Sequence, residues 1–455
     1  MSRPGSLLPA LVYAALTTSI VSSLGMLLVP SIAAGLDVSV GSAQWMLTVN
    51  LLVGAIVTPV MGRLSDGPHT HRLLLISLST IFAGSVIAAV APNFAIFLVG
   101  RALQGLSYGI VPVTIVLARR HLPRPQVDPA ISTLSVTVAT GLGIGYPLTG
   151  VLASLFDFRF AFWFAAVFVA TAGAVVWKLI PNAAAGAVSR HFDVPGTVLL
   201  SVALAATLTA VSQGPSWGWG SPPTVGLAAV AVIAFGLWIV VELRSRDPLI
   251  NLRVFKTPDV FLANATAIGL GATLYMSLSI SSIIAQAPAA TGYGIGLPLF
   301  WAGFVMLPLS AGSLTGNRIV RRLGPGAMTA MLPVGAGIMA VSALMLWFTS
   351  DELWEILLGM ALFGLGMGAA YAAMPALIAR NVAVFEVGSA VSFNQVLRTV
   401  GGALGAAVTG AVLAARPGTE GITSSLGAAA VGGTIVFVAL VANQLRMRRP
   451  TTKQS

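Results

Sequence analysis

Apolar residues recur along the chain in long runs that short polar stretches separate. Each run is close to the ~20 residues that cross a bilayer as an α-helix, and charged side chains rarely interrupt it. Runs of this length favour membrane-spanning helices over the amphipathic helices of a soluble fold. We therefore predict fourteen membrane-spanning helices, in the ranges 8–34, 43–62, 72–91, 94–118, 127–154, 160–180, 194–213, 223–242, 258–284, 294–316, 325–348, 352–378, 386–414 and 422–444.

The composition supports an all-α integral membrane protein. Hydrophobic residues make up 56% of the 455 residues and charged residues only 8%, whereas soluble domains carry about 25% charged residues. The first apolar run has no small-residue cleavage site, so we interpret it as a retained helix rather than a removed signal peptide. The chain has no cysteine, which excludes a disulfide framework and a thiolate metal site.

The basic residues are distributed unevenly between the two sides of the predicted bundle. All Lys and Arg residues except Arg101, Arg159, Arg398 and Arg416 lie on the side of the N-terminus. Because an excess of Lys and Arg marks cytoplasmic loops, we predict that both termini are cytoplasmic. The same distribution accounts for the net charge of +11 without a nucleic-acid partner.

Two segments far apart in the sequence repeat each other. GLGIGYPLTG at 141–150 and GGALGAAVTG at 401–410 share three glycines and one threonine. The predicted helices before them also match, from Gly100 with Gly359 to Gly109 with Gly368, at an offset of 259 residues. Chance similarity between glycine-rich helices is the alternative, but two adjacent helices keep nearly the same offset.

The repeat predicts how the chain is divided. We expect two pseudo-symmetric six-helix halves, at 1–180 and 258–446, and an inserted helix pair with its linkers at 181–257. A basic cytoplasmic tail follows at 447–455. Two repeated halves around a central cavity are typical of secondary transporters.

Several short motifs have spacings that are specific when taken together. They are GRLSDGPHTHR at 62–72, RALQG at 101–105, GLGIGYPLTG at 141–150, and the stretches FDVPGTVLL, SQGPSWGW and DPLINLRVF around the inserted pair. With them the chain resembles the major facilitator superfamily, and within it the fourteen-helix drug:proton antiporter branch. The resemblance covers nearly the whole chain.

The resemblance implies a secondary transporter and not an enzyme. It implies export of small amphipathic organic compounds, as in multidrug efflux and antibiotic resistance, by alternating access in a bacterial inner membrane. The implied partners are the small-molecule substrate and the lipid bilayer, and the implied assembly is a monomer. No cofactor or metal is expected, and the proton gradient is the implied source of energy.

The motif at 141–150 carries a row of small residues. Gly141, Gly145 and Gly150 lie along one face of the predicted helix, which lets a neighbouring backbone approach closely, and Pro147 bends the helix. Tight packing is the ordinary interpretation of such a face. The resemblance implies instead a hinge between the halves that limits proton leak and sets the direction of transport.

The motif at 62–72 places an acid in a basic loop. An exposed loop acid is normally a solvated charge, but the resemblance implies a latch across the cytoplasmic face, completed by Arg119 or Arg120. Gly67 and Thr70 stand where family members have basic residues, which predicts a weaker latch. The residues proposed for the latch or for proton coupling are Gly62, Asp66, Arg72, Asp128 and Glu386.

Arg101 interrupts an apolar run. A charge inside the membrane costs at least ~2.5 kcal/mol, so the side chain either extends to the interface or faces a polar cavity. Arg101, Gln104 and Tyr108 form one helical stripe, which favours the cavity, and Arg398 is a partial counterpart. The candidate cavity residues are Asn50, Arg101, Gln104, Tyr108, Asn264, Tyr275, Tyr371, Asn394 and Arg398. A lone Asn or Gln in such a helix often only bridges two helices.

No predicted helix interior contains an acid. The resembled antiporters usually carry an aspartate in the first helix, nine residues before a proline; here the proline is Pro30 and that position holds Val21. An uncoupled facilitator of a weakly anionic metabolite is therefore the alternative, since buried arginines without acids suit an electron-rich substrate. A transporter-like sensor or scaffold is a third candidate function. The glycine-rich helices of both halves argue against it. We expect Arg101 to orient its wall by binding backbone carbonyls and waters.

Overall fold

The computed structural model describes residues 4–24, 28–38, 40–43, 45–181, 193–324, 327–416 and 418–448. All regular structure in these ranges is helical, and none of it is a strand. The helices of the first part are α1 (Pro4–Ser23), α2 (Val29–Gly35), α3 (Val40–Ala43), α4 (Trp45–Ser65), α5 (Thr70–Val90), α6 (Phe94–Gln104), α7 (Ile110–His121), α8 (Arg124–Leu155) and α9 (Phe158–Leu179). A 3-10 turn, η2 (Gly105–Gly109), joins α6 to α7.

The second part continues in the same way. Its helices are α10 (Val194–Trp217), α11 (Pro222–Arg244), α12 (Pro258–Gln286), α13 (Leu299–Phe304), α14 (Leu307–Leu323), α15 (Met328–Phe348), α16 (Leu353–Asn381), α17 (Val387–Ala415) and α18 (Thr419–Arg448). Most of the predicted linker between α9 and α10 and most of the predicted basic tail lie outside the described residues.

Helices lie at all the predicted ranges, but three ranges are not single α-helices. The range 8–34 is divided between α1 and α2, and the range 94–118 is divided into α6, the 3-10 turn η2 and α7. The range 294–316 starts too early, since the helix begins only after Pro298, and it is divided between α13 and α14. Pro308 at the start of α14 has no N–H to continue the hydrogen bonding of α13.

Twelve helical stretches of the described residues are long and apolar enough to cross a membrane, and one of them is α6, η2 and α7 taken together (Phe94–His121). α8 and α14 are not among these twelve, so the predicted number of fourteen is not reached on this measure. α14 has only 17 residues and ends in the basic pair Arg321 and Arg322.

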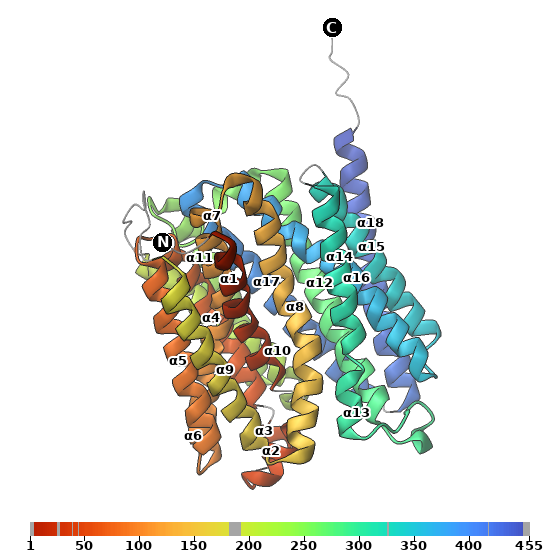
Figure 1. The fold of residues 1–455 in the computed structure, drawn as a ribbon. Helices are drawn as coiled ribbons and strands as arrows, with labels where there is room; N and C mark the ends of the chain where they lie inside the picture. Colours follow the sequence, from red (N-terminus) through yellow and green to blue (C-terminus); the bar gives the residue numbers. More distant parts are fainter. Residues whose placement is uncertain are drawn as a thin grey trace.

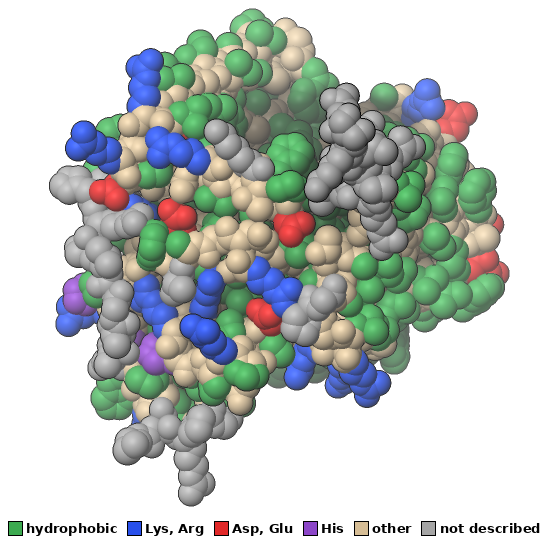
Figure 2. All heavy atoms as spheres, turned by 90° about the horizontal axis from the view of Figure 1, so that it is seen from above, with side chains coloured by type: hydrophobic (Ala, Val, Ile, Leu, Met, Phe, Trp, Pro, Cys, Tyr) green, Lys and Arg blue, Asp and Glu red, His purple; other side chains and the backbone are tan. Residues whose placement is uncertain are grey.

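The long helices run side by side in one bundle (Figure 1). α1 begins and α18 ends at the top of this view, and we call that end of the bundle the terminal face. The first helices lie to the left and α12 to α16 with α18 to the right. Figure 2 looks down on the terminal face and shows Lys and Arg side chains spread across it.

Matching glycines in the two parts make matching contacts. A Cβ added at Gly105 would meet α4, and one added at the matching Gly364 would meet α14. A Cβ at Gly141 would meet α1, and one at Gly401 would meet α12. Glycine is needed at these positions because the neighbouring helix occupies the space of a side chain. α10 and α11 pack together, and α10 also contacts both α4 and α17.

Candidate functional site

A cavity of about 390 Å³ lies between the helices of the two parts. Its walls come from α1, α4, α6, η2, α8, α10, α12 and α17. The residues of α10, α12 and α17 that line it belong to the later halves of these helices, such as 208–216 and 402–413. These helices start at the terminal face, so the cavity lies toward the opposite face of the bundle (Figure 1).

The cavity wall is mainly apolar with uncharged polar groups. Arg101 is its one charged residue, and no Asp or Glu lines it among the described residues. Three tyrosines, Tyr108, Tyr146 and Tyr275, contribute phenol rings from different helices. A wall of this kind suits aromatic compounds with polar substituents, because the rings provide flat apolar area and the hydroxyl groups can hydrogen-bond.

Arg101 is almost fully buried, with 1% of its surface exposed. Its Nε donates a hydrogen bond to the carbonyl oxygen of Met46 (3.4 Å), and its Nη1 donates to the carbonyl oxygen of Val21 (3.4 Å). Nη1 also donates to Oε1 of Gln104 at 2.7 Å. The guanidinium therefore connects α6 to the backbones of α1 and α4 instead of extending to an interface, and carbonyl dipoles take the place of a carboxylate partner.

The two neighbours of Arg101 in the predicted stripe differ in position. Tyr108 lines the cavity together with Arg101. Gln104 lies behind the wall, where its Nε2 donates to Oγ of Ser85 in α5 at 2.8 Å. Asn50 lines the cavity, and its Nδ2 donates to the backbone oxygen of Arg101 at 3.0 Å.

Arg398 and Asn394 lie below the cavity, toward the terminal face. Arg398 is one helical turn from Gly402, which lines the cavity, and its guanidinium stacks on the ring of Tyr371 at 4.7 Å. Nη2 of Arg398 also donates to Oε1 of Gln395. Asn394 donates to the backbone oxygen of Ala263 at 3.1 Å, which is the helix-bridging role that a lone asparagine often has.

The predicted cavity residues thus divide into two groups. Those that line the cavity are Asn50, Arg101, Tyr108 and Tyr275. Those that do not line it are Gln104, Asn264, Tyr371, Asn394 and Arg398, all of them buried. The sequence pattern could identify a polar side chain on an apolar helix, but it could not tell which neighbour that side chain faces.

Asp66 follows the end of α4 and caps the start of α17. Its Oδ1 accepts a hydrogen bond from the backbone N–H of Gly388 at 2.8 Å, and its Oδ2 accepts one from Ser389 at 3.1 Å. The first N–H groups of a helix have no partner within the helix and carry partial positive charge. The carboxylate of one part of the chain therefore stabilises a helix end of the other part.

Burial controls the protonation of this carboxyl group. Burial raises the pKa of Asp66 from its ordinary value of 3.8 to about 7, although the hydrogen bonds from Gly388 and Ser389 and the charge of Arg63 act in the opposite direction. A carboxyl group with such a pKa exchanges its proton near neutral pH.

Gly62 lets α4 and α17 touch beside Asp66. A Cβ at Gly62 would lie 2.2 Å from Oγ of Ser392 and 2.6 Å from the backbone oxygen of Gly388. Gly62 lies inside α4, which continues to Ser65, beyond the predicted end of this helix at 62. The glycine therefore serves close helix contact and not the end of the helix.

Arg120 holds the loop that carries Asp66. Its Nη1 donates to the backbone oxygen of Gly67 at 2.8 Å and to Oγ1 of Thr70 at 2.7 Å, and its Nη2 donates to the backbone oxygen of Asp66. The two positions where family members have basic residues therefore accept hydrogen bonds from an arginine of α7.

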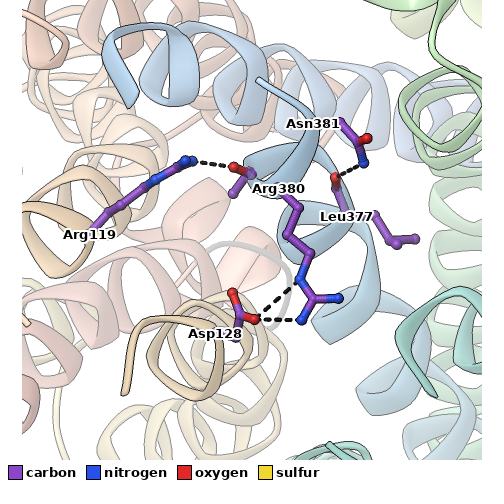
Figure 3. Close-up of polar contacts among 6 residues, drawn as sticks. Arg119, Asp128, Leu377, Arg380 and Asn381 are labelled. Carbon is purple, nitrogen blue, oxygen red and sulfur yellow. Dashed lines mark hydrogen bonds and ion pairs between the residues drawn. The ribbon is translucent and has the colours of Figure 1, made fainter. Parts of the chain in front are cut away.

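A second set of contacts crosses the terminal face (Figure 3). Arg380 of α16 pairs with Asp128 of α8: Nη2 and Nε lie 2.5 Å and 3.2 Å from Oδ2. Arg119 of α7 donates to the backbone oxygen of Ala379 in α16. Both contacts join the first part of the chain to the second.

The remaining predicted latch residues have other positions. Arg72 is exposed. Oε1 of Glu386 accepts a hydrogen bond from Nδ2 of Asn251 at 3.1 Å. Arg63 lies 3.9 Å from Asp247, which connects the end of α4 to the segment after α11.

The glycines of the motif at 141–150 pack mostly within the first part of the chain. A Cβ at Gly141 would lie 2.3 Å from Ser19 and one at Gly145 would lie 2.2 Å from Ser23, both residues of α1. Pro147 lies on the side toward α13 and is close to Gly303. Gly150 is buried. The motif therefore places α8 directly between α1 and a helix of the second part.

Comparison with known proteins agrees with this architecture. The sequence profile described as "Major Facilitator Superfamily" matches residues 10–406. The chain belongs to the major facilitator superfamily. It is therefore a multi-pass membrane transporter and not an enzyme.

Relatives of this superfamily member carry names of drug transporters. The chain is 27% identical over 429 residues to the tetracenomycin C resistance and export protein of Streptomyces glaucescens, covering 91% of this chain and 77% of the relative. It is 26% identical to the multidrug resistance protein B homolog of Mycobacterium tuberculosis, covering 88% and 77% of the two chains. The crystal structure of the human organic anion transporter MFSD10 (TETRAN) has a TM-score of 0.70 at 15% identity and covers 97% of this chain and 100% of that one.

Sequence reasoning missed part of this transporter's cavity wall. Tyr146 lies between two residues that were identified, Gly145 and Pro147, and its phenol lines the cavity. Thr48 and Ser212 also line it and share a hydrogen bond of 2.9 Å between α4 and α10. Hydroxyl residues are common in membrane helices, so no sequence signal distinguished these from the rest.

Proposed function

We propose that this transporter exports small amphipathic organic compounds by alternating access and that the structure is its outward-facing state. The observation that carries the proposal is the position of the cavity opposite a closed terminal face. The cavity reaches Ser216, which is exposed at the far end of α10. At the terminal face, the contacts of Asp66 with α17 and of Asp128 with Arg380 hold the two parts together.

The terminal face is the cytoplasmic face in this proposal. The charge bias supports it, because of all Lys and Arg residues only Arg159 and Arg416 fall in loops or helix ends on the opposite side. Both termini are then cytoplasmic in a bacterial inner membrane. α8, with 32 residues, and the α13–α14 pair complete fourteen spans, and α10 and α11 are the inserted pair between two six-helix halves. We propose a monomer as the functional unit.

The cavity favours neutral or anionic aromatic compounds over permanent cations. A cation would enter a low-dielectric space that has no carboxylate among its lining residues and holds the charge of Arg101. The phenol rings and the serine and threonine hydroxyl groups offer stacking and hydrogen bonds to a polycyclic compound. The names of relatives that export tetracenomycin C or confer multidrug resistance are consistent with this class.

Proton coupling is part of the proposal, with Asp66 as the proton site. Its pKa of about 7 allows protonation near neutral pH. Its hydrogen bonds hold α4 against α17, and this contact must open when the transporter changes to the inward-facing state. Asp128 and Glu386 are the other acids that we propose for coupling. An uncoupled facilitator is the second candidate, since Val21 replaces the usual acid and no acid lines the cavity in the part of the chain that the structure describes.

Export from bacterial cells without their own drug pumps tests these proposals. Cells that produce the transporter are loaded with fluorescein, an anionic phenol, or with ethidium, a permanent cation, with and without a protonophore. We expect export of fluorescein to exceed that of ethidium and to stop with the protonophore. Downhill movement that ignores the protonophore would support the facilitator, and no movement of either dye relative to vector controls would support the sensor or scaffold.

A further inference from the structure

The two halves meet along two lines of helix contact, and the helices pack differently along each line. Along one line, α8 meets α13 directly, since a Cβ at Gly303 would lie 2.9 Å from the backbone oxygen of Tyr146. Along the other line, α4 meets α17 near the terminal face, where Gly62 lies against Gly388 and Ser392. Farther from that face, residues of both α4 and α17 line the cavity. The second line therefore needs another element to separate the cavity from the lipid.

α10 occupies this position with one ridge of side chains. The residues of the ridge recur every four positions, the spacing of a ridge that runs obliquely across a helix surface, and are Leu200, Leu204, Leu208, Ser212 and Ser216. The leucines belong to an apolar cluster with Ala55 of α4 and with Phe393 and Val396 of α17. The lower part of the ridge thus fills the space between the two halves.

The upper part of the same ridge faces the cavity. Leu208, Ser212 and Ser216 all line it. Oγ of Ser212 lies 2.9 Å from Oγ1 of Thr48 in α4. On the other side, a Cβ at Gly410 of α17 would lie 3.8 Å from Pro215, which is ordinary contact. α10 therefore touches both halves at the level of the cavity.

We propose that α10 is a substrate-contacting wall that closes the outward-facing cavity between α4 and α17. The inference rests on the proposed export function and assigns to Leu208, Ser212 and Ser216 a part in selecting the substrate. The hydroxyl groups offer hydrogen bonds to polar substituents of an aromatic compound, and Leu208 contacts its apolar part. Repacking this ridge would change which compounds are exported without touching Arg101 or the terminal face.

The absence of cysteine gives a direct test, because an introduced cysteine is the only thiol of the chain. Ser212→Cys is compared with Ser201→Cys, a control on α10 outside the cavity wall, and with Ser221→Cys, a control beyond the far end of α10. Intact cells are treated with a membrane-impermeant methanethiosulfonate that carries a sulfonate. We expect labelling of S212C and S221C but not of S201C, at least ~10-fold slower labelling of S212C with saturating fluorescein, and no protection of S221C.

Labelling of S212C should also reduce fluorescein export at least ~10-fold, while labelling of S221C leaves it unchanged. The inference is overturned if S212C is not labelled, or if it is labelled with neither protection nor loss of export while the unlabelled variant exports. Absence of fluorescein export by the unsubstituted chain is a different result and contradicts the proposed function. In that case, labelling of S212C and its protection by bound fluorescein still decide whether α10 faces a binding cavity.

Discussion

Arg101 illustrates how a membrane helix carries a buried cation without an acid. Its hydrogen bonds go to carbonyl oxygens of Met46 and Val21 and to the side chain of Gln104. The fork of the guanidinium reaches partners on three helices at once, which a lysine ammonium cannot reproduce. One side chain thus sets the relative positions of α1, α4 and α6 at the cavity wall.

Replacing Arg101 should therefore abolish transport without loss of the folded protein. We expect Arg101→Ala and Arg101→Lys to reduce export at least ~10-fold, because the lysine restores the charge but not the directed hydrogen bonds. Export is measured as dye efflux and is normalised to the amount of protein in the membrane. Near-normal export by Arg101→Lys would show that the charge alone is sufficient.

Gly62 provides a second prediction at this scale. In Gly62→Ala the added methyl group would collide with Ser392 and with the backbone of Gly388, so α17 cannot approach α4 and the terminal face stays open. Alanine favours a helix by about 1 kcal/mol over glycine, so helix propensity does not explain a loss. We expect at least ~10-fold lower export than for Gly173→Ala, whose added Cβ meets nothing within 4 Å. Equal export by the two variants would contradict this role.

At the scale of the helices, the contact of α4 with α17 makes closure of the terminal face depend on pH. The pKa of Asp66 is about 7 when the face is closed and returns toward 3.8 when water reaches it. The closed form then binds the proton more tightly, so closure is favoured at low pH and weakens as the pH rises from about 4 to about 7.

Thiol labelling checks this dependence in inside-out vesicles. The labelling rate of Ser65→Cys, which is buried in the contact, is divided by that of Ala383→Cys, which is exposed on the same face. This ratio corrects for the pH dependence of an exposed thiol, which is the form in which Ser65→Cys reacts when the face opens. We expect the ratio to rise between about pH 5 and about pH 7 and to stay constant in the Asp66→Asn background. A constant ratio with Asp66 present would exclude it as the titrating group.

The ion pair between α8 and α16 should contribute less than the Asp66 contact. Arg380 and Asp128 are partly exposed, with 32% and 27% of their side-chain surfaces accessible, and pairs of this kind are worth about 0.2–1 kcal/mol. A double-mutant cycle with Asp128→Asn and Arg380→Gln, read out by the labelling ratio of Ser65→Cys, measures the coupling. We expect a coupling at or below ~1 kcal/mol that decreases with salt; a salt-independent coupling of several kcal/mol would indicate a desolvated pair.

For the whole molecule, the two faces have different roles. The closed contacts and most basic side chains lie at the terminal face (Figure 2), and the cavity lies toward the other face. In intact cells, an impermeant thiol reagent should label Ser221→Cys and not Ala383→Cys, and in inside-out vesicles the pattern should be reversed. Labelling of Ala383→Cys in intact cells would invert the assignment of the cytoplasmic face and would make the structure inward-facing.

Much of the architecture was determined by the sequence alone. The length of the apolar runs predicts membrane-spanning helices, since a helix has to satisfy its backbone hydrogen bonds within the bilayer. The glycine repeat marks equivalent helix contacts because only a residue without a side chain permits them, as at Gly105 and Gly364. Arg101 and Asp66 were identifiable because a charge in or beside an apolar run is costly unless it has a partner.

The tertiary structure alone decided the partners and the faces. Arg398 and Asn394 have the same sequence signature as Arg101 and Asn50, but they lie below the cavity and bind neighbouring side chains or backbone groups. The direction of a polar side chain depends on the helix that packs beside it, and that helix comes from a distant part of the chain. For the same reason, no local pattern could show that Ser212 of α10 meets Thr48 of α4 at the cavity, or that Asp66 meets the start of α17.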